Sequence, residues 1–599
     1  MADVTGDGSG LTKSVHTSDE AHRRLRRRYN FEWRFKAIGM AAIALAAFAL
    51  IALLSTVLGN AVGAMRETYI TIPVQLDMEV IGVAADADRD AIRRGNFDGL
   101  VRKSLRRVVS SATSRSDKRA LHKLVSDGAA LSLRQAVMEN PTMLGQTQSI
   151  ALLASDDADL WIKGYGDKFE LLPSSGTATP VVTGEQVEIV VESSAFQTIL
   201  LTIKQSLRDA ATVLRQQAVA QGRGAAVFEG RLKNTSLIGE PRRNIEASLT
   251  GYRTQVADLT AKADALTKRA EAPGGYGELT TELPSFFVRI NGGVVKVERA
   301  SGDTIVGRPI LPLQLDQSAA TGSWRLERLL TSEDGRRVND QQAVWLEELR
   351  NSGMISRTIN WNFLSSSNSR EAEIAGVWGA VVGSFWTMLV TFLLAFPVGV
   401  MAAIYLEEFA PKNGITDFIE VNINNLAAVP SIVFGLLGLA VFISFFGVPR
   451  STAMAGGIVL ALMTLPTIII ASRAAIKAVP PSIREAALGV GASKIQTVSH
   501  HVLPLAMPGI MTGTIIGMAQ ALGETAPLLM IGMFAFIREI PTGITEPATA
   551  LPVQIYQWSD FPERLFEMKT AAAIVVLLLF LITMNALAIL LRRRFERRW

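Results

Sequence analysis

The chain reads Val479-Pro-Pro-Ser-Ile-Arg-Glu-Ala-Ala-Leu-Gly-Val-Gly491 between two long apolar runs. Pro480 and Pro481 stop any helix that arrives from upstream, because proline lacks a backbone N–H and clashes with the preceding turn. Ser482, followed three residues later by Glu485, predicts a capping box, in which each side chain accepts a hydrogen bond from the other residue's backbone N–H. The stretch therefore predicts a short helix that begins abruptly.

The rest of the stretch predicts a compact helix with one flat face. Ala486 and Ala487 give that face small side chains. Gly491 can end the helix or let it turn at low steric cost. Leu503-Pro504 then lead into the next apolar run.

Six apolar runs are long enough to cross a bilayer, which takes roughly 20 residues of helix. Of the 599 residues, 49% are hydrophobic and 19% charged, which indicates a membrane protein with a large soluble part. The first run is Ala37 to Leu58; a signal peptide is the alternative, but the run and the tail before it are too long for one. Pro397, Pro430 and Pro527 lie inside later runs, where neighbouring helices can satisfy the freed backbone groups. The other five runs are about Ala375–Leu406, Val421–Phe446, Ala453–Ser472, Leu505–Phe534 and Thr570–Leu591.

Basic residues predict that both ends of the chain are cytoplasmic. Six spans bring the chain back to its starting side, so the loop 474–504 is expected inside and the region between the first two runs outside. The loop Glu407–Glu420 should also be inside but is acidic; acidic residues weigh little in this rule. The net charge of +5 does not indicate nucleic-acid binding, because no basic patch alternates with aromatic residues. The flanking basic residues are His22, Arg23, Arg24, Arg26, Arg27 and Arg28, and Arg592, Arg593, Arg594, Arg597 and Arg598.

The region between the first two runs has mixed α and β patterns. Alternating residues predict strands at Tyr69–Leu76 and Gln186–Glu192, and Asn291-Gly292 predicts a hairpin turn. Apolar residues share one helical face over 196–214, and a heptad stripe runs over 245–266. These two helices are expected either to project as a coiled coil that meets a partner or to pack on each other or against the sheet.

These patterns divide the chain into four parts. They are a cytoplasmic basic tail (1–36), a first transmembrane helix (37–64), an extracytoplasmic α+β domain (65–372) and a five-helix core (373–599) with the loop 474–504. Residues 1–29 of the tail are expected to be disordered. The predicted fold class is therefore an all-α transmembrane region of six helices, with an α+β domain between the first two.

The loop resembles that of the permease subunits of ABC importers. Their pattern is Glu-Ala-Ala, three residues, Gly, nine residues, Ile, one residue and Leu-Pro. Here His501 stands in the place of Ile, and the matching residues are Glu485, Ala486, Ala487, Gly491, Leu503 and Pro504. The resemblance implies a type I permease fold, in which this loop forms a coupling helix that docks in a cleft of an ATPase subunit. A small-residue face suits docking, since the helix can enter closely and transmit a rigid-body push.

Three further segments resemble the PstA family of phosphate permeases, a likeness that covers about residues 371–599. They are Gly523-Glu-Thr-Ala-Pro-Leu-Leu529, Val429-Pro-Ser-Ile-Val-Phe-Gly435 and Leu551-Pro-Val-Gln-Ile-Tyr556.

Glu524 is an ionisable residue within an apolar run, where charge is costly and usually faces a path or a partner. One interpretation is that it pairs with an arginine, in this chain or on a partner permease, and shapes or gates a path with Gln520, Thr525 and Pro527. The other is a structural pair that holds a helix break before Pro527. Gln520 is one helical turn earlier and is expected on the same face. It stands where PstA relatives often have arginine, so it brings no positive charge.

The sequence predicts no catalytic, metal or cofactor site. The chain has no cysteine, and its five histidines form no ligand constellation. Residues 6–14 faintly resemble a phosphate-binding glycine loop, but Thr12 precedes Lys13 where such a loop needs glycine. ATP and Mg are therefore expected on separate ATPase chains.

We expect a permease subunit of an ATP-driven phosphate importer, multi-pass in the bacterial inner membrane. The resemblance implies a second, PstC-like permease, a PstB-like ATPase dimer and an external PstS-like phosphate-binding protein. One alternative is a permease for another oxyanion such as sulfate, molybdate or phosphonate. Another is a transporter whose external domain also senses or docks a partner. A membrane sensor alone would need a signalling helix after the second run, and four more apolar runs follow instead.

Overall fold

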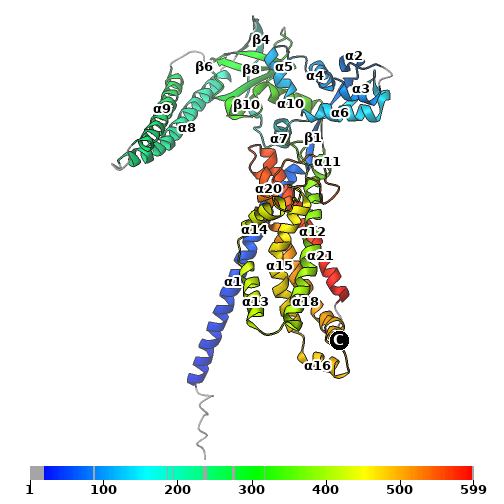
Figure 1. Ribbon diagram of the computed structural model, residues 1–599. Helices are drawn as coiled ribbons and strands as arrows, with labels where there is room; N and C mark the ends of the chain where they lie inside the picture. Colours follow the sequence, from blue (N-terminus) through cyan, green and yellow to red (C-terminus); the bar gives the residue numbers. More distant parts are fainter. Residues whose placement is uncertain are drawn as a thin grey trace, which may run out of the picture. The chain divides into compact units, whose positions relative to one another are not determined.

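The computed structural model describes residues 19–595 except 85–87, 185, 193–194, 234–238, 273–276 and 316. These residues form two units (Figure 1). The α/β unit contains residues 66–364 and 369–376. The helical unit contains the chain up to residue 65, residues 365–368 and the chain from residue 377 onward.

Two antiparallel sheets form the frame of the α/β unit. The smaller sheet has β1 (Arg66–Gln75) between β11 (Ile355–Ile359) and β2 (Thr147–Leu153). Arg66 pairs with Ile359, so the strands at the two chain ends of the unit are neighbours. The larger sheet consists of β3 (Glu170–Leu172), β4 (Ala178–Thr183), β5 (Gln186–Val191), β6 (Gly277–Glu278), β7 (Pro284–Ile290), β8 (Gly293–Ala300), β9 (Thr304–Leu311) and β10 (Arg325–Ser332). Its order is β3-β10-β7-β8-β9-β5-β4, with β6 beside β8.

Short helices and one long helical hairpin cover these sheets. Trp345 of α10 belongs to the core shared with β1, whereas Leu207 of α8 and Ala263 of α9 belong to the core on the larger sheet. The helices are α2 (Met78–Ile81), α3 (Arg89–Arg94), α4 (Phe97–Val108), α5 (Arg115–His122), α6 (Gly128–Glu139), α7 (Asp156–Lys163), α8 (Ala195–Leu232), α9 (Glu240–Glu271), α10 (Asp340–Asn351) and α11 (Trp361–Ser365), with 3-10 turns η1 (Pro141–Met143) and η2 (Glu333–Gly335).

The strands and the hairpin turn predicted from the sequence are confirmed. β1 and β5 lie where the alternating patterns placed them, and β7 pairs with β8. Asn291 and Gly292 have φ of 49° and 77°, the positive values that a two-residue hairpin turn needs.

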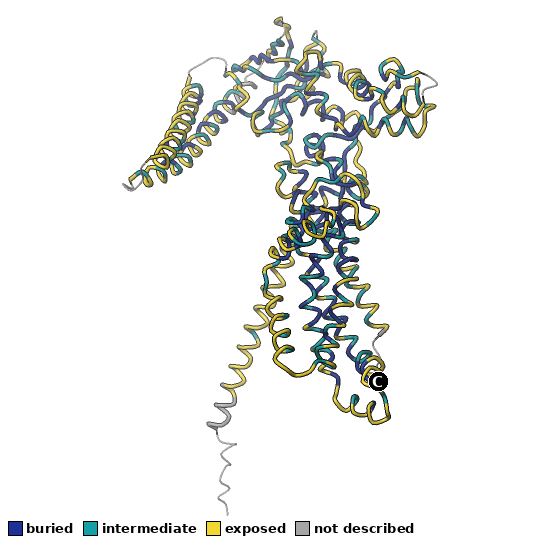
Figure 2. Tube along the Cα trace, viewed as in Figure 1, coloured by how far each residue is buried: buried dark blue, intermediate teal, exposed yellow. Residues whose placement is uncertain are grey.

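The two predicted helices of this unit, α8 and α9, pack side by side as a hairpin (Figure 1). Small side chains such as Ala218 and Ala225 are buried in its seam, and the rings of Phe228 and Tyr252 stack at 5.4 Å. The base of the hairpin packs on the larger sheet, while its outer faces are exposed along the remaining length (Figure 2). The two helices thus pack on each other and, at their base, on the sheet, and the hairpin extends beyond the sheet.

The helical unit contains five helices that are long and apolar enough to cross a membrane, or six if the bent pair α13/α14 is one span, among the described residues. α15 packs against both α12 and α18. Small residues allow close approach: a Cβ on Gly513 would lie 2.2 Å from that of Ala471. The elements are α1 (Asp19–Ala64), α12 (Trp378–Ile404), α13 (Gly414–Ala427), α14 (Ser431–Leu437), α15 (Ala453–Lys477), α16 (Pro481–Gly489), α17 (Lys494–Thr497), α18 (Leu503–Gly523), α19 (Ala526–Met530), α20 (Leu551–Ser559) and α21 (Arg564–Phe595), with π-helical turns η3 (Tyr405–Phe409), η4 (Gly438–Ile443) and η5 (Val498–Val502).

Three expectations about the helical unit were wrong in detail. The tail was expected to be disordered to residue 29, but α1 is continuous from Asp19, because good helix formers follow an acidic start. The run 421–446 is not one helix, since α13 and α14 meet at 105° around Pro430. The run 505–534 is not one helix either, because α18 ends at Gly523 and the short helix α19 follows it. Residues 1–18, with the rejected glycine loop, and Arg597 and Arg598 lie outside the described residues.

Candidate functional site

α16 starts at its second proline. Pro480 is the N-cap, with extended backbone, and Pro481 is the first helical residue, a position for which its fixed φ is suited. Ser482 is therefore already inside the helix and makes no capping hydrogen bond. The predicted capping box of Ser482 and Glu485 is wrong.

A true capping box occurs eleven residues later, at the start of α17. Ser493 Oγ accepts a hydrogen bond from the Gln496 backbone N–H at 3.3 Å, and Gln496 Oε1 accepts one from the Ser493 N–H at 2.9 Å. The same Ser-x-x-Gln signature was available in the sequence.

The loop around α16 presents a mixed polar and apolar surface. Glu485 and Ala486 are exposed, whereas Ala487 is buried against the helical unit. Gly491 has φ of +92°, so this turn requires glycine. Val490 and Ile495 are 86% and 70% exposed, an apolar patch that the sequence reading did not single out.

The downstream end of the pattern begins α18. Leu503 and Pro504 are the first two residues of that helix and are half-buried. His501, in the place of the family's Ile, is exposed on η5, whereas its neighbour Val502 is fully buried. The apolar packing of this turn is thus supplied by Val502.

Arg484 holds α16 to the rest of the helical unit, a role that the sequence reading missed. Its guanidinium donates to Glu408 Oε1 at 2.9 and 2.7 Å, to the Val479 carbonyl at 2.6 Å and to the Ile476 carbonyl at 2.9 Å. Glu408 lies on η3, which continues α12. One side chain therefore joins α16, the end of α15 and the end of α12.

A second arginine explains the acidic loop Glu407–Glu420. Arg473 of α15 lies 3.4 Å from Glu407 and 3.0 Å from Glu420. Three acidic residues of this loop, Glu407, Glu408 and Glu420, thus pair with arginines on neighbouring elements of the same end of the unit. The acidity of the loop is therefore no argument against a cytoplasmic position.

Two helix breaks meet inside the helical unit. α14, which follows the bend at Pro430, packs against α19, which follows the end of α18. A Cβ on Gly435 would lie 2.7 Å from Pro527 Cα and 2.9 Å from Met530 Cβ. The segments 429–435 and 523–529, far apart in sequence, are therefore in direct contact. Broken helices of this kind commonly surround the substrate path in transporters.

The predicted path residues are only partly brought together. Gln520 is exposed on α18, and Glu524 follows the helix end with extended backbone, so the two do not share a helical face as expected. Glu524 is half-buried, and its carboxylate makes no hydrogen bond or ion pair within the part of the chain described. Thr525 is half-buried at the start of α19, and Pro527 is buried against Gly435.

Asn368 fixes α20, another contact that sequence spacing did not reveal. Its amide donates to Gln557 Oε1 at 2.9 Å, and Trp558 Nε1 donates to Asn368 Oδ1 at 2.9 Å. Ser384 Oγ accepts from the Leu551 N–H at 2.8 Å. All three of these bonds are buried, which makes the start of α12 and α20 one rigid element.

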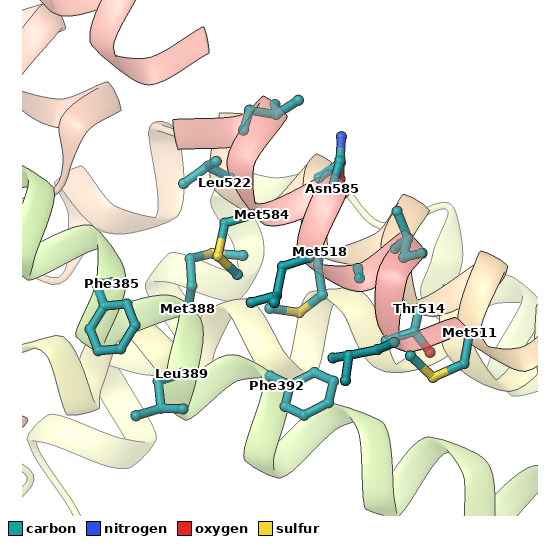
Figure 3. A pocket seen from close by; sticks show the side chains of 16 residues that line it. Phe385, Met388, Leu389, Phe392, Met511, Thr514, Met518, Leu522, Met584 and Asn585 are labelled. Carbon is teal, nitrogen blue, oxygen red and sulfur yellow. The ribbon is translucent and has the colours of Figure 1, made fainter. Parts of the chain in front are cut away.

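A cavity of about 200 Å³ lies between α12, α18 and α21 (Figure 3). Methionine, leucine and phenylalanine side chains from these helices point into it, and Thr514 and Asn585 are the polar residues of its lining. An anion would find no charged partner there. The described residues also contain no cluster of side chains that could hold a metal ion.

Two family models match this chain. Residues 395–599 match the family described as binding-protein-dependent transport system inner membrane component. Residues 22–170 match a domain of unknown function (DUF3333).

Several permeases are similar to the chain. The probable ABC transporter permease protein YqgI of Bacillus subtilis (strain 168) is 32% identical over 209 residues, which are 33% of this chain and 71% of that protein. The phosphate transport system permease protein PstA 1 of Mycobacterium tuberculosis (strain ATCC 25618 / H37Rv) is 30% identical over 257 residues, or 43% of this chain and 82% of that protein. PstA of Yersinia pestis is 31% identical over 213 residues, or 36% and 71%. Among solved structures, an inward-facing MetNI methionine ABC transporter is 19% identical over 37% of this chain and 95% of that chain, with a TM-score of 0.29.

Proposed function

Because the chain belongs to the family of binding-protein-dependent transport system inner membrane components, we propose that it is the permease subunit of an importer for inorganic phosphate. The family consists of transport permeases and not of enzymes, so ATP hydrolysis would take place on separate ATPase chains. The phosphate part of the proposal is supported by the PstA relatives.

The observation that carries the proposal is the contact between the two helix breaks. Both contacting segments, 429–435 and 523–529, are those that resemble PstA, and Glu524 lies next to the contact without a partner among the described residues. A lone carboxylate would repel phosphate, so we assign Glu524 to a pair with an arginine of the second permease. Gln520, Thr525 and Pro527 would line the same passage.

Coupling would run through α16. Its exposed Glu485 and Ala486, with Val490 and Ile495 beside them, suit a cleft on an ATPase subunit. Arg473, Lys477, Arg484 and Lys494 gather at this end of the unit, which supports a cytoplasmic position. ATP binding would close the ATPases and push α16. This movement would open the passage at the two helix breaks to one side of the membrane or the other.

The α/β unit would then lie outside the membrane, between the first two spans. Its hairpin α8/α9 leaves its outer faces exposed (Figure 2), which supports a second role in docking a partner. The assembly would comprise a PstC-like permease, a PstB-like ATPase dimer and a PstS-like binding protein.

Purification of the tagged full-length chain from its native membrane tests this assembly. We expect a second permease and an ATPase to copurify, and the ATPase rate of the complex to rise with phosphate-loaded binding protein. Sulfate, molybdate and phosphonate serve as matched competitors. Stimulation by one of these and not by phosphate would replace the proposed substrate with another oxyanion.

A further inference from the structure

Arg484 is the point at which three elements of the helical unit meet. It belongs to α16, its carbonyl acceptors belong to the end of α15 and the residues after it, and its carboxylate acceptor, Glu408, belongs to η3. The side chains of Arg484 and Glu408 are 22% and 13% exposed, so water screens this pair less than a surface pair.

The π-helical turn η3 directs two consecutive carboxylates to two different helices. Glu407 pairs with Arg473 of α15, and Glu408 pairs with Arg484 of α16. π-Helical turns inside an α-helix often mark functional positions. Here the turn brings the end of α12 to a helix that is 76 residues away in the chain.

The covalent connections of α16 lead to α15 on one side and through α17 and η5 to α18 on the other. No covalent connection links α16 directly to α12. The Arg484–Glu408 pair therefore provides a short path by which displacement of α16 can move α12.

We propose that Arg484 is a positioning residue that couples α16 to α12 through Glu408, so that a push on α16 moves α12 and α15 together. This inference rests on the proposed function, because it assigns the push to ATPase closure. A guanidinium suits the task, since its planar fork can bind two carbonyls and a carboxylate at once. In a purely structural role, Arg484 would hold the loop in place but would not affect the coupling of ATP hydrolysis to transport.

The test uses the purified full complex in proteoliposomes and counts oxyanion accumulated per ATP hydrolysed. We expect Glu408→Gln and Arg484→Gln each to lower this ratio at least about fivefold, the lower end of coupling between protein sites. The double variant should be no worse than Arg484→Gln. Arg484→Lys keeps the charge toward Glu408 but loses the planar fork, so its ratio should lie between those of Arg484→Gln and wild type.

Glu407→Gln is the matched control, because it removes the adjacent carboxylate. Arg473 still has Glu420 as an ion-pair partner in this variant. It should leave the ratio unchanged. An unchanged ratio in Glu408→Gln, an equal loss in Glu407→Gln, or Arg484→Lys as poor as Arg484→Gln would each overturn the inference. Equal amounts of assembled complex and equal thermal unfolding midpoints show that a lowered ratio is not a folding defect.

The ratio is measured for whichever oxyanion the wild-type complex accumulates. Failure with phosphate alone would thus contradict the proposed substrate, while the comparison among variants still decides the role of Arg484.

Discussion

Gly435 lies so close to Pro527 that a Cβ at position 435 would be 2.7 Å from Pro527 Cα. Two carbon atoms that are not bonded do not approach to this distance unless a backbone moves, so only glycine fits here. The contact joins the helix after the bend at Pro430 to the short helix after Gly523. The two broken runs therefore form one packed feature.

Gly435→Ala should separate the two breaks and lower transport by about tenfold or more, because overpacking of this kind costs about 1–3 kcal/mol. Gly414→Ala is the control, since a Cβ there meets nothing within 4 Å. Uptake into cells, divided by the amount of chain in the membrane, is the measurement. Equal uptake by the two variants would show that the contact is not needed.

Glu524→Gln should lower transport about tenfold while the complex still assembles, because it removes the charge assigned to a partner arginine. Gln520→Ala, on the exposed face of α18, should have a smaller effect. Because the chain has no cysteine of its own, a Glu524→Cys variant can be crosslinked at that position alone to locate the partner on the second permease. A normal rate in Glu524→Gln would refute the gating role and favour a purely structural one.

Glu485→Ala should leave α16 folded, because Glu485 makes no capping bond and alanine is the better helix former. We expect ATP hydrolysis to continue while transport falls, since the exposed carboxylate would contact the ATPase. Lys494→Ala, exposed on the neighbouring α17, is the control. Normal coupling in Glu485→Ala would rule out the docking role.

Asp340→Asn should destabilise the α/β unit by about 3–5 kcal/mol, the cost of breaking a buried ion pair. Its carboxylate is 1% exposed, lies 2.5 Å from Lys296 and also pairs with Arg336. Hydrogen exchange of β8 and α10 in the full-length chain reports the change. Asp98→Asn, in an exposed pair with Arg102, should change exchange little.

Burial raises the pKa of Asp156 to about 7 from 3.8, helped by Asp157 and Glu373 and opposed by Arg337. The folded state therefore holds a proton that the unfolded state has lost, and stability falls as pH rises from about 4 to about 7. We expect Asp156→Asn to stabilise the α/β unit at pH 8 but not at pH 4, by roughly 4 kcal/mol at most.

His122 has the opposite effect, since burial and Arg106 lower its pKa and stability then rises with pH. The comparison of Asp156→Asn with wild type cancels that contribution. Thermal unfolding of the full-length chain at several pH values is the measurement. Parallel curves for the two proteins would contradict the assignment to Asp156.

Local patterns predicted the elements whose causes are local. The turn at Asn291-Gly292 needs two positive φ values, and the heptad stripe in α9 needs one apolar face, so both could be read from neighbouring residues. The start of α16 was misread because Ser482 matched a capping signature while Pro481 already had the backbone of a first helical turn.

Long-range features could not be read in this way. Hydropathy predicted one span for residues 421–446. It measures the free energy of transfer to lipid and carries no information on the direction of the helix axis, so the bend at Pro430 does not change it. The pairs of Arg484 with Glu408 and of Asn368 with Gln557 join residues 76 and 189 positions apart. Only the packing of helices brings such residues together.

The most direct test of phosphate import is the uptake of radioactive phosphate by cells that lack this chain. The account predicts that uptake falls at low external phosphate and that the wild-type chain restores it, whereas the Glu485→Ala variant does not. Failure of the wild-type chain to raise phosphate uptake above that of the cells that lack it, with every other phosphate importer deleted, would contradict it.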